Sequence, residues 1–95
     1  MRTARRCRVN QDKFWSAYEA GLLRAVTEGM GGGYCYGPEL VPSVVAKMRR
    51  AVETQGSVAR VDYRAPGFRL ACKALGIPFN RAGLDGYLFG VGVAR

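Results

Sequence analysis

The sequence predicts a single α+β domain that is predominantly helical. Apolar residues recur every three or four positions over much of the chain, and glycine or proline interrupts the pattern, which favours several helices. One stretch, residues 57–63, alternates apolar and polar residues instead, as strands do. The chain has 95 residues, 48% of them hydrophobic, which is enough for one domain with a thin core. We expect a basic arm at residues 1–9, followed by one compact domain at residues 10–95.

Two longer helices are predicted at residues 11–28 and 42–55. Asn10 is suited to cap the first helix and Gly29 to end it, while Pro42 is tolerated in the first turn of the second. Each helix has an apolar stripe at four-residue spacing, with Phe14, Tyr18 and Leu22 in the first and Val44, Met48 and Val52 in the second.

A strand is predicted at residues 57–63, where one face would carry Ala59, Val61 and Tyr63. A single strand needs a partner to satisfy its backbone hydrogen bonds. The possible partner strands are residues 2–9, in the basic arm, and residues 87–93, where aromatic and apolar residues also alternate.

A pair of shorter helices is predicted at residues 66–75 and 80–88, with Gly76 ending the first and Asn80 capping the second. This stretch, LACKALGIPFNRAGLDGYL from Leu70 to Leu88, locally resembles a helix-turn-helix motif. An αα-hairpin without a DNA-binding role is the alternative. In the resemblance, Cys72, Gly76, Ile77 and Ala82 take the small, turn-glycine, apolar and interhelix positions, and Leu84 and Leu88 face the core.

The charge of the chain indicates an anionic partner. There are 15 Lys and Arg residues against 7 Asp and Glu, which gives a net charge of +8. Twelve of the 15 are Arg, whose planar guanidinium binds phosphate and guanine edges through paired hydrogen bonds. The positive charge is concentrated in residues 1–9 and 47–73, and the intervening residues are slightly acidic. We therefore expect a surface that binds nucleic acid, DNA rather than RNA.

The candidate nucleic-acid-binding residues follow from this placement. Asn80 and Arg81, at the start of the second short helix, are expected to contact base edges in a DNA groove. The arm is expected to lie in a minor groove or along the backbone. The arm residues are Arg2, Arg5, Arg6 and Arg8, and the expected phosphate contacts are Lys47, Arg50, Arg60, Arg64, Arg69 and Lys73.

The glycine-rich stretch 29–37 contains Tyr34 and Tyr36, which we interpret as stacking or interface aromatics. The stretch does not match a P-loop, because Gly37 is followed by Pro38 and Glu39 rather than by Lys and Ser or Thr.

Histidine is absent, which excludes Ser-His and Cys-His catalysis and the most common zinc ligand. The three cysteines are widely spaced and predict neither a disulfide framework nor a metal site, and Cys72 is expected to be buried. No apolar run is long enough to span a membrane or to form a signal peptide. We expect a cytoplasmic, non-enzymatic protein without a cofactor.

These observations predict a small, basic DNA-binding protein of bacterial or phage type with a helix-turn-helix-like face. The alternative is an inhibitor from a phage or mobile element, anti-CRISPR-like in character, that binds an acidic host protein or nucleoprotein complex. The oligomeric state is left open.

Overall fold

The computed structural model describes residues 2–28, 37–64 and 66–90, and this part of the chain is helical. Its residues form four α-helices and one short 3-10 helix, with no strand among them. The elements are α1 (Arg2–Glu28), the 3-10 helix η1 (Pro38–Leu40), α2 (Val41–Gln55), α3 (Pro66–Leu75) and α4 (Arg81–Phe89).

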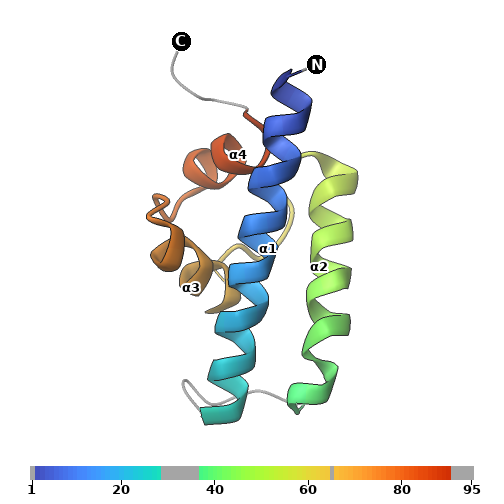
Figure 1. The fold of residues 1–95 in the computed structure, drawn as a ribbon, viewed down its shortest axis with the longest axis vertical. Helices are drawn as coiled ribbons and strands as arrows, with labels where there is room; N and C mark the ends of the chain where they lie inside the picture. The colour runs from blue at the N-terminus through green and yellow to red at the C-terminus, as the bar shows by residue number, and fades with distance from the viewer. Residues whose placement is uncertain (1, 29–36, 65, 91–95) are drawn as a thin grey trace.

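Helix α1 is the element on which the other helices pack (Figure 1). Its 27 residues, at 1.5 Å per residue, span about 40 Å, and α2 runs beside it on one side while α3 and α4 lie on the other. The predicted stripe of Phe14, Tyr18 and Leu22 is confirmed, because all three side chains are buried. One cluster of buried side chains joins α1 to α2, α3 and α4.

The centre of the core is aromatic. Phe14, Trp15 and Tyr18 of α1 surround Phe68 of α3, with ring centroids between 4.9 and 6.2 Å apart. The backbone of α3 comes close to α1 here, because a Cβ at Gly67 would lie 2.5 Å from the Tyr18 ring. Glycine at this position therefore allows the aromatic cluster to close.

The predicted pair of short helices is confirmed as α3 and α4. Gly76 adopts a φ of +70°, and the amide of Ile77 donates to the carbonyl of Cys72, which ends α3. The side-chain oxygen of Asn80 accepts from the Gly83 amide at 2.7 Å and caps α4. Leu84 and Leu88 are fully buried, as predicted.

The predicted strand at residues 57–63 is wrong, because this segment forms successive turns. The hydroxyl of Ser57 accepts from the Ala59 amide, and the carboxylate of Asp62 accepts from the Arg64 amide. Side chains that bond to nearby backbone amides in this way compete with a sheet ladder. The apolar residue Val58 is fully buried from within this turn.

Both proposed partner strands are wrong as well. Residues 2–9 continue α1 toward the N-terminus, so the predicted start at residue 11 is too late. Residues 87–89 belong to α4, and residues 91–93 lie outside the described part. Asn10 is a mid-helix residue rather than a cap. Its side-chain amide donates to the backbone carbonyl of Tyr87 at 3.0 Å, and the side-chain amide of Gln11 donates to the backbone carbonyl of Leu88 at 3.1 Å. These two side chains satisfy carbonyls that the end of α4 leaves unpaired.

Candidate functional site

Two of the three basic side chains of α2 lie on the face opposite its core contacts. Val45 and Val52 are buried, whereas Lys47 and Arg50 are exposed. Neither base forms an ion pair with a described residue. Both are therefore available to an external anion.

Helix α3 has the same arrangement. Gly67 and Leu70 face α1, where a Cβ at Gly67 would meet Tyr18 and a Cβ at Gly21 of α1 would meet Leu70. At 100° per residue, Arg69 and Lys73 then point away from both α1 and the core, and both are exposed. They too have no acidic partner among the described residues.

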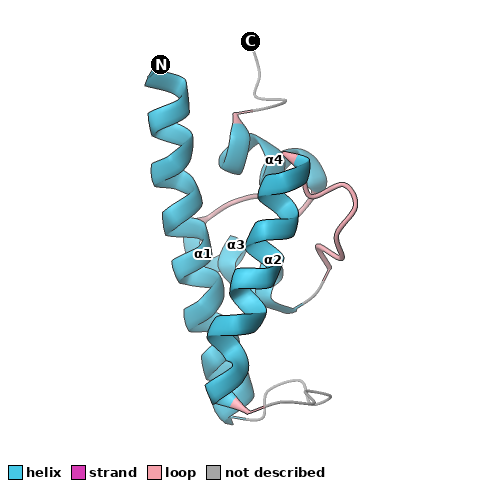
Figure 2. Cartoon of the chain, turned by 90° about the vertical axis from the view of Figure 1, so that its right-hand side faces the viewer, coloured by secondary structure: helices cyan, strands magenta, loops and turns pink. Residues whose placement is uncertain are grey.

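The segment 56–64 leaves the C-terminal end of α2, passes behind α1 in the view of Figure 1 and leads to α3; in Figure 2 it is the loop at the right. Two contacts fix it to α4 and to the preceding turn. The buried carboxylate of Asp85 accepts from the Ser57 hydroxyl and the Val58 amide, both at 2.8 Å. The ring of Tyr63 contacts Phe79, with centroids 6.1 Å apart.

Arg60 and Arg64 in this segment are exposed, and so is Arg81, two residues after Phe79. Together with the bases of α2 and α3 they are the exposed bases without an ion pair that we call the basic face, a set that extends over elements on both sides of α1. The only exposed acid in the segment is Asp62. The basic face consists of Lys47, Arg50, Arg60, Arg64, Arg69, Lys73 and Arg81.

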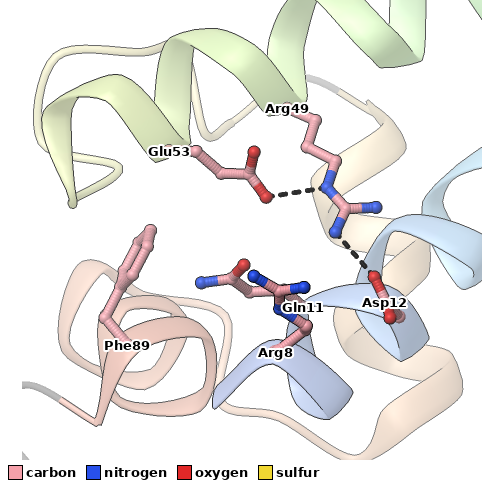
Figure 3. A pocket seen from close by; sticks show the side chains of 6 residues that line it. All are labelled: Arg8, Gln11, Asp12, Arg49, Glu53 and Phe89. Carbon is pink, nitrogen blue, oxygen red and sulfur yellow. Dashed lines mark hydrogen bonds and ion pairs between the residues drawn. The ribbon is translucent and has the colours of Figure 1, made fainter. Parts of the chain in front are cut away.

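Exposed acids gather elsewhere, between α1 and α2 (Figure 3). Arg49 bridges Glu53 at 2.8 Å and Asp12 at 2.6 Å. The hydrogen bond to Glu53, reinforced by the one to Asp12, raises the pKa of Arg49 above its usual value. Arg49 is therefore held by two carboxylates, unlike the bases of the basic face.

A cavity of about 400 Å³ adjoins this network, and its lining includes Arg8 and Phe89 (Figure 3). Arg8 is exposed and forms no ion pair with a described residue. It lies beside the acids of α1 and α2 rather than on the basic face. Arg2, Arg5 and Arg6 belong to the first turns of α1, and their side chains lie outside what the structure describes, as do Tyr34 and Tyr36.

The groove-reading role predicted for Asn80 and Arg81 stays a prediction, and the structure defines what each side chain has available. The oxygen of Asn80 is used by the helix cap, whereas its amide nitrogen forms no hydrogen bond with a described residue. Arg81 is the only basic residue of α4. One face of α4 packs against the rest of the protein, because Leu84, Asp85 and Leu88 are buried.

Chemistry of other kinds has little support in the described residues. No group of three or more Cys, Asp or Glu side chains is placed there to hold a metal ion. Cys72 is buried, as predicted, and this burial raises the pKa of its thiol to about 11, so it stays protonated at neutral pH. None of the described helices is long and apolar enough to cross a membrane.

Comparison with protein-family models, curated proteins and solved structures finds no significant match to the chain.

Two features of this region were not predicted from the sequence: the carboxylate of Asp85 that holds the segment 56–64, and the contact between Tyr63 and Phe79. A signal for the second was present, since both aromatic residues stand within two positions of an arginine. Aromatic residues interleaved with bases are typical of nucleic-acid surfaces.

Proposed function

We propose that the protein binds nucleic acid through the basic face, without catalysing a reaction. The observation that carries this proposal is the separation of charge. Seven exposed bases on α2, α3, the segment 56–64 and the start of α4 have no ion pair with a described residue, while Arg49 takes up the acids between α1 and α2. Unpaired bases attract phosphates and release their counterions, which gives affinity without a deep pocket.

A salt titration tests this function. If five to seven of the bases contact phosphates, the logarithm of the association constant for labelled duplex DNA should fall against the logarithm of salt concentration with a slope of about −5 to −6. Fluorescence anisotropy at salt concentrations from 50 to 300 mM would measure it. A slope near zero for both this duplex and a single strand of the same length, or no binding of either at low salt, would overturn the proposal.

Paired variants assign the binding to the basic face. The double variant Lys47→Gln, Arg50→Gln removes two charges from it and should reduce the slope by about 2. The matched control Arg8→Gln, Lys13→Gln removes two charges from exposed positions of α1 that likewise form no ion pair with a described residue, and it should leave the slope within about 0.5 of the starting value. Equal losses in both variants would show that net charge, rather than this face, determines binding.

The alternative function, inhibition of a host protein with an acidic surface, would draw on the same seven bases. The two candidates differ in nuclease sensitivity. A stoichiometric complex with a host protein that survives nuclease treatment, in a protein that binds no free nucleic acid, would favour the inhibitor.

A further inference from the structure

We infer that the nucleic acid bound at the basic face is single-stranded and that an unpaired base stacks on Phe79. This inference rests on the proposed function and specifies its substrate. It starts from an exposed aromatic ring. Phe79 lies in the turn between α3 and α4, and 38% of its surface is accessible to solvent.

The position of the Phe79 ring is fixed by its neighbour. Tyr63 contacts it in an edge-to-face arrangement, with centroids 6.1 Å apart and the ring planes at 72°. Tyr63 is in turn packed against the hydrophobic core. The exposed ring is therefore supported from below, as a stacking platform requires, and is not a freely rotating side chain.

Groups suited to phosphates and base edges surround this ring. Arg64 directly follows Tyr63, and Arg81 stands two residues after Phe79, so the contact between the aromatic rings brings both exposed residues into the neighbourhood of the platform. Next to Phe79 in the chain, the side-chain amide nitrogen of Asn80 has no hydrogen-bond partner among the described residues and can donate to a base edge. Two flanking cations make an apolar protein partner a poor fit here.

The local shape favours a single strand over a duplex. In a duplex the bases stack on one another and offer only their edges, so an aromatic ring on a protein surface gains nothing from their faces. Reading adenine in a major groove uses both the oxygen and the nitrogen of an asparagine side chain, but the oxygen of Asn80 already accepts from the Gly83 amide at 2.7 Å. A base that is already unpaired can reach Phe79 without any opening of α4.

The experiment compares a 15-nucleotide oligothymidine with a 15-base-pair duplex, using anisotropy at one salt concentration. Phe79→Leu keeps an apolar side chain but removes the ring, and we expect it to weaken single-strand binding by about 5- to 150-fold. Duplex binding should change less than about twofold. Leu23→Ala is the control, because Leu23 is 40% exposed on α1, away from the basic face, and both affinities should be retained.

A fluorescent readout reports stacking directly. Phe79→Trp introduces an exposed indole that differs from Trp15, the single native tryptophan, which is 3% exposed. Oligothymidine should quench the new emission and the duplex should not, and the variant should keep single-strand affinity. Circular dichroism confirms that each variant is folded.

The outcomes separate the inference from the proposed function. If Phe79→Leu binds both probes as tightly as the unaltered protein does, or if the duplex quenches the indole equally, the stacking inference is wrong while salt-dependent binding still supports the function. If neither probe binds with a salt-dependent affinity, the proposed function itself fails.

Discussion

Removing the carboxylate of Asp85 should destabilise the domain, because this side chain bonds the start of the segment 56–64 to α4. Its two oxygens accept from the Ser57 hydroxyl and the Val58 amide, both at 2.8 Å, and only 9% of the residue is exposed. Asp85→Ala deletes both acceptors. The Val58 amide then loses its partner in a region from which water is excluded.

The size of the loss in stability depends on which of the two donors, the Ser57 hydroxyl and the Val58 amide, water can hydrate once the carboxylate is gone. Hydrogen bonds to a charged group contribute about 1.5–3 kcal/mol each. Ser57 is only half-buried, so its hydroxyl can be rehydrated, and the variant also avoids burying a carboxylate. The remaining cost is mainly the unpaired Val58 amide, and we expect a loss of about 2–3 kcal/mol in the free energy of unfolding. For a domain of this size that lowers Tm by about 10–20 °C.

The assay is thermal and urea unfolding followed by circular dichroism at 222 nm. Asp62→Ala is the matched control, since it removes the same charge from an exposed carboxylate whose one hydrogen bond, to the Arg64 amide, is longer at 3.3 Å. It should cost less than about 0.5 kcal/mol. Equal stability of the two variants would refute the reasoning, as would fast hydrogen exchange at the Val58 amide in the unaltered protein.

Three further predictions concern the core and the helix ends. Gly67→Ala places a Cβ 2.5 Å from the Tyr18 ring, and this overpacking should lower the free energy of unfolding by about 1–3 kcal/mol in urea; no loss would show that the ring can move aside. Burial raises the pKa of Cys72 from 9.0 to about 11, so the unfolded state loses its thiol proton first and stability falls as pH rises from about 9 to about 11. The stability advantage over Cys72→Ala should therefore shrink across that range in melts at successive pH values, and a constant difference would contradict the shift. Asn10→Ala removes the donor to the Tyr87 carbonyl and should cost about 0.5–1.5 kcal/mol, with faster amide exchange at the end of α4; unchanged exchange there would show that water replaces the side chain.

The helices that the sequence predicts well are those whose ends are fixed by local chemistry. Helix α3 matches its predicted range, α2 differs from its range by one residue at the start, and α4 differs by one residue at each end. Gly56 and Gly76 explain this accuracy for α2 and α3, because each follows its helix with a φ near +70°. Stop signals of this kind act within a few residues, so they can be recognised without the tertiary structure.

The errors occur where distant residues decide the structure. Asn10 is a residue type that often caps helices, but its side-chain amide instead donates to the carbonyl of Tyr87, 77 positions away. The strand at residues 57–63 fails for the same reason, since the donors of Ser57 and Val58 bond to Asp85 in α4. An alternating pattern gives the side-chain period of a strand, but it cannot show whether a partner strand exists.

The candidate site, too, could be predicted from the sequence only in part. Composition and the runs of charge identify the candidate bases. The helix face on which each base lies depends on which residues of α2 and α3 face α1, and the sequence does not show that. Phe79 shows the limit most clearly. In the sequence it is one apolar residue of a turn, and only the contact with Tyr63 places it beside Arg64 and Arg81.

How the acids are used explains why a net charge of +8 produces a usable surface. Asp12 and Glu53 bind Arg49, Glu28 binds Arg24, and Asp85 is enclosed by the segment that it anchors. At physiological ionic strength a charge acts over a Debye length of about 8 Å, so a carboxylate that already binds an arginine or a backbone amide adds little repulsion to a phosphate bound farther away than that. Affinity for a polyanion should then depend on the bases that touch it rather than on the net charge of the chain. For this reason, removing two positive charges from α1 and removing two from α2 are expected to change the salt dependence of binding by different amounts.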